Sequence, residues 1–333
     1  MARLNRRVFA LKSTAVAGGI IIGGPILGAH AQSATPSANA EVPVVIGEDG
    51  SITITHAQGE TTLPGVPSKI VTFDIASLDT LDALGIDITG TAQGSLVGHL
   101  EKYNNEPYLN VGTLFEPDYE AVAALEPDLI IVANRSAAVY PDLSTIAPTI
   151  DLTALDSNDH LLSLATNARI LGEIFGKQEE VETALADINA RVEALKPVAA
   201  DAGTCLVIMT TGGEVTILPA AGATGGRGSF IYNTLGLAPV IEDIADATHG
   251  EAVSFEFLLE TNPDWLFVID RDAATGEESE AAAQVLDNEI VHETTAWQND
   301  QIVYLEPFPW YIAMNGITVT GLMLDDLEAG LGA

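Results

Sequence analysis

Two stretches of this chain follow one plan at one spacing, and this repeat constrains the fold more than any other feature. In each, a glutamate precedes a Pro-Asp pair by seven positions, four apolar residues follow, and an arginine stands eight positions after the proline: Glu120 to Arg135, and Glu256 to Arg271. The pattern predicts a helix, a tight turn, a buried strand and an arginine just past the strand's carboxyl end. Because ligands of open α/β sheets bind at that end, we expect two similar lobes that each present an arginine to one cleft.

The first 31 residues are typical of an export signal. Residues 5–12 form a twin-arginine pattern, residues 14–28 are mostly apolar, and residues 29–31 (Ala-His-Ala) fit a signal peptidase site. A membrane anchor is disfavoured because the apolar stretch is too short to span about 30 Å of hydrocarbon and Pro25 interrupts it. No cysteine stands directly after the cleavage site, so we expect no lipid anchor and a periplasmic mature protein.

The rest of the chain is strongly acidic. The formal net charge is −34, and loss of a signal with four basic and no acidic residues brings it near −38. Such a surface repels nucleic acid and anionic membranes, so neither is an expected partner, and salt adaptation is the favoured explanation. Nine of the 13 Lys and Arg lie beyond the signal, and three of these, Arg135, Arg227 and Arg271, fall at predicted strand ends or loop-to-helix junctions. Arginines so placed in an acidic protein indicate an anion site.

The apolar pattern divides the chain into two lobes. Residues 32–41 are rich in Ser, Ala, Pro and Asn and are predicted to be a disordered linker. Residues 42–157 and 198–333 alternate strands and helices, whereas residues 158–197 have a helical period with glycines that allow a bend or short break, ended by Pro197 and Gly203. The predicted fold class is therefore α/β, with two lobes of mainly parallel sheets joined by a long rigid α-helix.

Individual elements follow from the same reading. The expected strands are residues 44–46, 52–55, 70–73, 88–91, 129–132, 149–152, 206–209, 266–269 and 302–305. The expected helices outside the linking segment are residues 77–85, capped by Ser77, and residues 118–125, 230–235 and 317–331. Glu48-Asp49-Gly50 is a hairpin signal between the first two strands.

Short motifs spread over residues 42–330 give the chain a family resemblance. In chain order they are His56-Ala57-Gln58-Gly59-Glu60-Thr61, Leu78-Asp79-Thr80-Leu81-Asp82-Ala83-Leu84-Gly85, Glu126-Pro127-Asp128-Leu129-Ile130-Ile131, Gly226-Arg227, Thr248-His249-Gly250, Asn262-Pro263-Asp264, Asp270-Arg271 and Trp310-Tyr311. Together they resemble the substrate-binding proteins of iron-siderophore ABC importers, above all the catecholate binders of enterobactin and petrobactin type. The resemblance implies the two-lobed class III architecture with one backbone helix, a ferric siderophore as transported ligand and an inner-membrane ABC permease as partner. We further expect a monomer, no cofactor and no enzymatic activity.

The three arginines match such a ligand, because ferric tris-catecholate is a trianion. Arg227 lies in a Gly-rich loop just before the predicted helix of residues 230–235, whose start would add free N–H groups and a positive dipole end. For any one arginine, a surface ion pair or a helix-capping contact is the alternative.

Further ligand contacts come from the resemblance. It places His249 and Tyr311 at the cleft, where imidazole and phenolate would complete the iron shell only if a tetradentate siderophore left two positions open. The alternatives are a loop histidine bonded to backbone and an aromatic wall. Trp310, Tyr140 and Phe308 are candidates to line the cleft, although any of them fits a core equally well. The remaining histidines have no partner at a meaningful spacing and are assigned structural roles.

Glu120 and Glu256 begin the two repeated units on early helix turns. In the resembled family, glutamates at matching positions dock onto permease arginines, so the same role is expected here. The alternative is that each is an ordinary acidic residue that favours the helix dipole.

Three other function classes fit the sequence less well. A cobalamin- or haem-binding relative of the same architecture would prefer aromatic walls to three arginines. A periplasmic metal-dependent enzyme is disfavoured because the sequence has no His-Glu-x-x-His, no Gly-x-Ser-x-Gly and no paired histidines at metal spacing. A zinc or manganese binder would need several converging His or carboxylate ligands.

Overall fold

The N-terminal lobe is built on a parallel sheet. In the computed structural model, which describes residues 42–333 apart from 95, 155, 157, 221–224 and 243–250, five strands lie in the order β6-β5-β4-β7-β8, all paired in parallel. Their bounds are β4 (Ile70–Thr72), β5 (Gly90–Thr91), β6 (Leu109–Asn110), β7 (Leu129–Val132) and β8 (Thr149–Asp151). β4 and β7 are buried along their whole length, as a sheet covered on both faces requires.

A second, antiparallel sheet precedes it. β1 (Val44–Ile46), β2 (Ile52–His56) and β3 (Gly59–Leu63) form a meander, so the predicted first hairpin is confirmed. The third strand was not predicted, because its Thr-rich sequence has little apolar alternation.

Helices cover the N-terminal lobe: α1 (Ile75–Ala83), η1 (Gly98–Asn104), α2 (Tyr119–Leu125), η2 (Asn134–Val139) and α3 (Tyr140–Leu143). The prediction that Ser77 caps the first helix is wrong. Asp74, two residues after β4, is the cap: its carboxylate accepts the backbone N–H of Ser77 at 2.8 Å and the Ser77 hydroxyl at 2.7 Å. Aspartate and serine cap helices about equally well, so local sequence could not decide between them.

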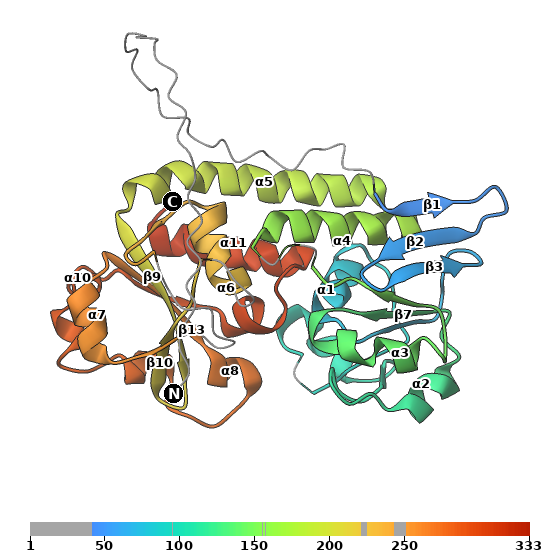
Figure 1. Cartoon of the computed structure of the whole chain (residues 1–333), viewed down its shortest axis with the longest axis horizontal. Helices are drawn as coiled ribbons and strands as arrows, with labels where there is room; N and C mark the ends of the chain where they lie inside the picture. The colour runs from blue at the N-terminus through green and yellow to red at the C-terminus, as the bar shows by residue number, and fades with distance from the viewer. Residues whose placement is uncertain (1–41, 95, 155, 157, 221–224, 243–250) are drawn as a thin grey trace, which may run out of the picture. The chain divides into compact units, whose positions relative to one another are not determined.

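Two helices, not one, form the linking segment. α4 (His160–Phe175) ends at Gly176, which has a left-handed φ of 66°, and the chain turns back into α5 (Gln178–Asp201) beside it (Figure 1). The two helices approach closely, since a Cβ on Gly172 would meet Cγ2 of Val181 at 2.9 Å. The prediction that Pro197 ends the helix is also wrong. A proline removes one helical hydrogen bond, and the helix tolerates that loss near its end.

The C-terminal lobe carries a six-stranded mixed sheet in the order β12-β10-β9-β13-β14, with β11 also paired to β9. Its strands are β9 (Thr204–Thr211), β10 (Glu214–Ile217), β11 (Ala238–Pro239), β12 (Glu251–Val253), β13 (Trp265–Asp270) and β14 (Ile302–Leu305). β11, β13 and β14 join the parallel part, while β10 and β12 are antiparallel. The predicted α/β class with two lobes is therefore confirmed.

The helices of this lobe are mostly short. They are α6 (Gly225–Ser229), η3 (Phe230–Thr234), α7 (Phe255–Thr261), α8 (Arg271–Thr275), α9 (Ala282–Val285), η4 (Val291–Glu293), α10 (Thr295–Gln298), η5 (Phe308–Ile312) and α11 (Ile317–Leu331). The C-terminal helix has the predicted bounds, and it packs on α1, α5 and β14, so it touches both lobes. No helix among the described residues is long and apolar enough to cross a membrane.

The repeated sequence pattern gives the same local structure twice. α2 and α7 both end at a residue in the left-handed conformation, Glu126 with φ 48° and Asn262 with φ 45°. The aspartate of each Pro-Asp pair then anchors the neighbouring strand: Asp128 accepts a backbone N–H just before β4 at 2.8 Å, and Asp264 accepts the first N–H of β9 at 2.8 Å. The two lobes are thus built from one unit at their cores.

Candidate functional site: an arginine cluster around Tyr311

Three arginines from different parts of the chain surround one tyrosine. The guanidinium carbons of Arg135, Arg227 and Arg271 lie 5.7, 4.4 and 5.9 Å from the ring centroid of Tyr311. Arg135 lies in η2 of the N-terminal lobe, whereas the other two lie in α6 and α8 of the C-terminal lobe. The repeat therefore does deliver its two arginines to one place between the lobes.

Tyr311 holds these arginines through its carbonyl and its hydroxyl. Its carbonyl oxygen accepts Nη2 of Arg135 at 2.7 Å and Nη2 of Arg227 at 3.4 Å, and its hydroxyl accepts Nε of Arg271 at 3.1 Å. Arg135 also donates to the carbonyl of Ile312 at 2.9 Å, so one arginine of the N-terminal lobe is bound to two carbonyls of η5.

The cluster concentrates positive charge that carboxylates compensate only in part. Burial, and next the charge of Arg135, lower the pKa of Arg227 to about 10, so the Arg227 guanidinium remains charged at neutral pH. The Nε of Arg227 is buried and has no hydrogen-bond partner among the described residues. A buried donor without a partner is costly, and an anionic oxygen would satisfy it.

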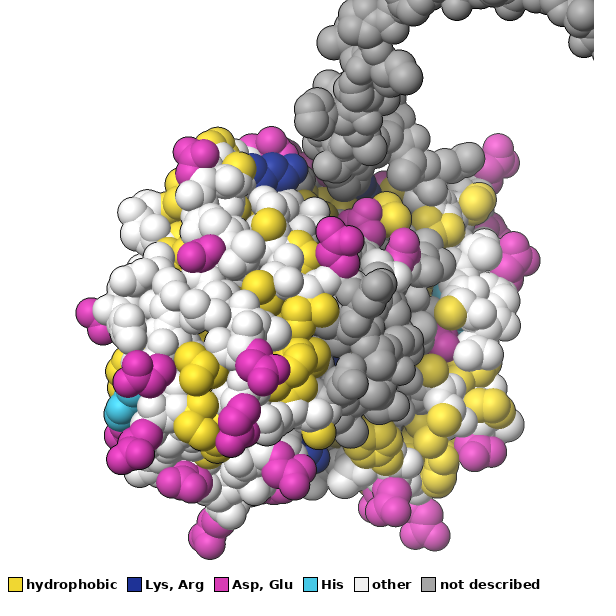
Figure 2. Space-filling view, turned by 60° about the vertical axis from the view of Figure 1, so that its left-hand side comes forward, with side chains coloured by type: hydrophobic (Ala, Val, Ile, Leu, Met, Phe, Trp, Pro, Cys, Tyr) yellow, Lys and Arg dark blue, Asp and Glu magenta, His cyan; other side chains and the backbone are white. Residues whose placement is uncertain are grey.

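The other basic side chains make the contrast clear. Six of them form ion pairs with carboxylates: Lys69, Lys102, Arg169, Lys177, Arg191 and Lys196. Arg271 pairs with Asp272 and Glu277, but Arg135 and Arg227 have no carboxylate at ion-pair distance within the described part of the chain. The face drawn in Figure 2 is scattered with acidic side chains. Carboxylates are therefore abundant in this protein, and Arg135 and Arg227 have none beside them because of where they lie in the fold.

A cavity of about 210 Å³ lies beside the cluster, lined by Arg135, Arg227 and Tyr311 together with residues of both lobes. One of these is Asp74, the cap of α1, whose pKa is raised chiefly by burial. Another is His160, the first residue of α4, which is 2% exposed and has Nε2 3.1 Å from the hydroxyl of Thr320. Burial lowers the pKa of His160 to about 4, so this imidazole is neutral. The sequence predicts a structural role for His160. Its position at the start of the linking segment was the one feature that could have indicated a place between the lobes.

Other candidates lie elsewhere. Trp310 is fully buried, and its indole N–H donates to Asp326 at 2.9 Å, so of its two expected places the structure favours the core over the wall of the cleft. Tyr140 packs against the ring of His56, 5.6 Å between centroids, and does not line the cavity. His249 lies outside the described residues.

The position of Arg227 also differs from the prediction. It lies inside α6, which runs directly into η3, and not in a loop before a helix. Arg227 therefore lies in the first turn of α6, and the contacts that the structure gives to the cluster are those of its side chain.

The two glutamates of the repeat occupy equivalent places. Glu120 and Glu256 are each the second residue of their helix, α2 and α7, and both are exposed. The pKa of Glu256 is lowered by hydrogen bonds from its own backbone N–H and from Ser254. Neither glutamate lines the cavity.

Comparisons with known proteins agree with this architecture. A family model described as periplasmic binding protein matches residues 70–308. The petrobactin-binding protein YclQ of Bacillus subtilis is 37% identical over 84% of this chain and 88% of its own length. The structure of a TroA-like periplasmic binding protein from Xylanimonas cellulosilytica is 45% identical with a TM-score of 0.77, covering 82% of this chain and 92% of its own. The periplasmic catecholate-siderophore binding protein VctP of Vibrio cholerae is 31% identical with a TM-score of 0.78, covering 84% and 98%.

The matched region contains both repeated units, the linking helices and all three arginines of the cluster. The family model covers more than half of the chain. The relatives align over most of this chain and over most of their own length. This chain belongs to the periplasmic binding protein family.

Proposed function

We propose that this protein is the solute-binding component of an ABC importer and captures a ferric, catecholate-type siderophore at the arginine cluster. One observation carries the proposal: Arg135 and Arg227 lie side by side without a carboxylate partner among the described residues, in a chain of net charge −34. Such a site is prepared for an anion from outside the protein.

The chemical class of the ligand follows from charge and from the relatives. Ferric tris-catecholate is a trianion, and the cluster offers three guanidiniums whose planar donors suit aryl oxygens. The similar proteins YclQ and VctP are named for petrobactin and for catecholate siderophores, respectively. No catalytic turnover is expected of such a binding protein.

Ligand binding must rearrange the site. The cavity of about 210 Å³ is smaller than the roughly 300–1,000 Å³ of typical ligand pockets. In the structure Arg135 is bound to the carbonyls of Tyr311 and Ile312 across the space between the lobes. We infer that the ligand takes Arg135 from these carbonyls and inserts between it and Tyr311.

Iron ligation by the protein is proposed for one ligand type. A tetradentate siderophore leaves two iron positions open, which Tyr311 and His249 would fill, since phenolate and imidazole are both ligands of ferric iron. A hexadentate siderophore needs only the charges and walls of the site. The Tyr311 oxygen lies 3.1 Å from Nε of Arg271, so iron would share it with that donor.

Delivery requires a permease. We propose that Glu120 and Glu256 contact basic residues of an inner-membrane ABC permease, one from each lobe, because both are exposed at the same position of equivalent helices. The protein would act as a periplasmic monomer, exported by the twin-arginine signal of residues 5–12.

Titration of residues 32–333 tests the function. Quenching of intrinsic fluorescence is measured with ferric tris- and bis-catecholate complexes, ferric citrate, cobalamin and haem. We expect submicromolar or tighter binding of the ferric catecholates and a severe loss in the variant with Arg135, Arg227 and Arg271 all replaced by Ala. Unchanged affinity in that variant would refute the anion site, and preferential binding of cobalamin or haem would refute the ligand class.

A further inference from the structure

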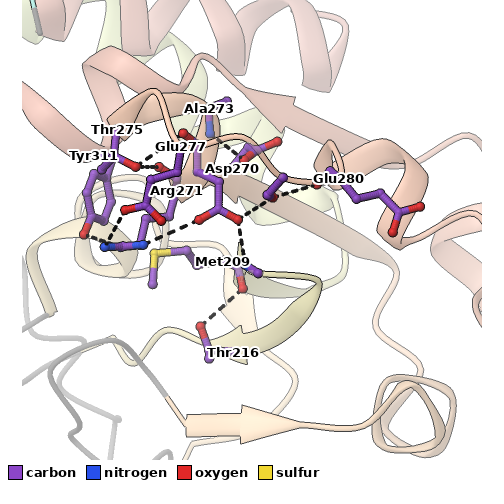
Figure 3. A network of polar contacts seen from close by, with 12 residues as sticks. Met209, Thr216, Asp270, Arg271, Ala273, Thr275, Glu277, Glu280 and Tyr311 are labelled. Carbon is purple, nitrogen blue, oxygen red and sulfur yellow. Dashed lines mark hydrogen bonds and ion pairs between the residues drawn. The ribbon is translucent and has the colours of Figure 1, made fainter.

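The three arginines of the cluster differ in their counter-charges. Arg271 alone has carboxylates at ion-pair distance: Oδ1 of Asp272 at 3.5 Å from Nη1, and Oε1 of Glu277 at 3.5 Å from Nη2 (Figure 3). It is also the arginine held by the Tyr311 hydroxyl. Two acidic groups therefore compete with any anionic ligand for Arg271. Whether a ligand can displace each of them depends on how firmly its carboxylate is held.

Asp272 is fixed in place. The residue is 4% exposed, and its Oδ2 accepts the backbone N–H of Gly212 at 2.6 Å and the hydroxyl of Ser279 at 2.5 Å. A ligand cannot displace a carboxylate that satisfies a backbone donor of the turn between β9 and β10. Asp272 is thus a permanent part of the scaffold behind Arg271.

The carboxylate of Glu277, in contrast, can be displaced from Arg271. Its backbone N–H donates to the carbonyl of Asp272 at 2.9 Å, which holds the main chain just after α8. Its side chain is 58% exposed, and its contact with Arg271 is the one ion pair recorded for it among the described residues. An exposed ion pair of this kind contributes only about 0–1 kcal/mol, so a strongly charged ligand can replace it.

We propose that Glu277 is a specificity-determining residue that competes with the ligand for Arg271. In the free protein its carboxylate neutralises part of the charge of Arg271, and a ligand oxygen takes its place on binding. Because Glu277 stays nearby after displacement, its negative charge opposes anionic ligands in general. This repulsion grows with the charge of the ligand, so Glu277 costs a trianion more than a monoanion and narrows the preference that the three arginines give to the more highly charged ligand. The inference rests on the proposed function, because it concerns the same site.

The test compares Glu277→Gln with Glu278→Gln. Both variants remove one negative charge from adjacent, exposed positions, but no ion pair is recorded for Glu278 in the described part of the chain. The probes are a ferric tris-catecholamide complex, a trianion, and a ferric bis-catecholamide complex, a monoanion. We expect Glu277→Gln to bind the trianion about two- to fivefold more tightly than wild type and the monoanion with a smaller gain, while Glu278→Gln stays near wild type.

A double variant shows whether the gain passes through Arg271. In an Arg271→Ala background the substitution Glu277→Gln should change affinity much less than it does in the wild-type protein. Equal affinities of Glu277→Gln and Glu278→Gln, or weaker binding by Glu277→Gln, would overturn the inference while leaving the proposed function intact. Failure of the wild-type protein to bind either probe would instead remove the proposed function, and this inference with it.

Discussion

At the scale of single residues, Tyr311 holds three positively charged side chains close together. Its carbonyl, hydroxyl and ring face each take part, so each guanidinium has a partner that is not a carboxylate. For Arg135 and Arg227, which have no carboxylate at ion-pair distance among the described residues, these neutral partners hold the guanidinium in position and leave its charge for the ligand. The cost falls on Arg227, whose burial and nearness to Arg135 lower its pKa.

This arrangement predicts opposite effects on binding and stability when Arg227 is replaced by Met. Loss of a charged contact should weaken binding of a ferric tris-catecholate by about 1–3 kcal/mol. The free energy of unfolding should stay the same or rise by up to about 2 kcal/mol, because a buried, repelled cation becomes apolar. Ligand titration and urea unfolding measure the two. Arg169→Met, which breaks an ion pair with Glu182 away from the cluster, is the control and should leave binding unchanged; a large loss of stability in the Arg227 variant would contradict the account.

His160 makes stability depend on pH. Its folded pKa of about 4 lies below the ordinary value of 6.5, so the unfolded chain binds more protons between these values. Stability contributed by the neutral imidazole is therefore full above pH 6.5 and is lost as the pH falls toward 4. Wild type should lose about 2.5 kcal/mol more than His160→Asn between pH 7 and pH 4.5, measured by urea unfolding. Parallel pH profiles for wild type and His160→Asn would exclude this role.

At the scale of elements, the sequence predicts best where one local pattern decides the structure. The apolar runs of β7 and β13 and the turns at Glu126 and Asn262 are encoded within each repeat, so both units form as expected. The turn between α4 and α5 was harder, because the apolar period continues through both helices and only the left-handed Gly176 marks the reversal. The antiparallel strands β10 and β12 are too short to show a clear period.

The same reasoning explains which contacts of the site could not be predicted from the sequence. Arg135 and Arg271 were found because each follows a predicted strand. Their partners lie far along the chain: Arg135 bonds to Ile312, 177 positions away, and His160 meets Thr320, 160 positions away. No local pattern encodes such contacts; they depend on how α4, η5 and α11 pack between the lobes.

Equivalent helices should also have equivalent roles in transport. We expect the double variant Glu120→Ala, Glu256→Ala to bind ferric catecholate as wild type does, because neither residue lines the cavity, yet to fail in supporting growth under iron limitation. Glu173→Ala with Glu179→Ala, on the linking helices, removes the same charge and should grow normally. Normal growth of the Glu120, Glu256 strain would refute docking through these residues.

At the scale of the whole molecule, two helices restrict movement between the lobes. α5 runs from the N-terminal lobe into the C-terminal one, and α11 packs on α1 and on β14 (Figure 1). Asp79 of α1 strengthens this link, because its carboxylate accepts the backbone N–H of Thr318, near the start of α11, at 2.8 Å. Helical connections resist hinge bending more than extended strands do. The two bonds of Arg135 to η5 are the part of this interface that a ligand can break.

Ligand binding should therefore change the lobe angle by only a few degrees, with the rest of the change confined to loops and side chains at the site. Small-angle X-ray scattering of residues 32–333, free and loaded with a ferric tris-catecholate, should give nearly superimposable curves. Arg135→Ala removes the two carbonyl bonds while α5, α11 and Asp79 remain, so the free variant should scatter as wild type does. If instead the ligand compacts the wild-type protein strongly, or Arg135→Ala opens it, the lobes are held mainly by the site and the two helices do not set the angle.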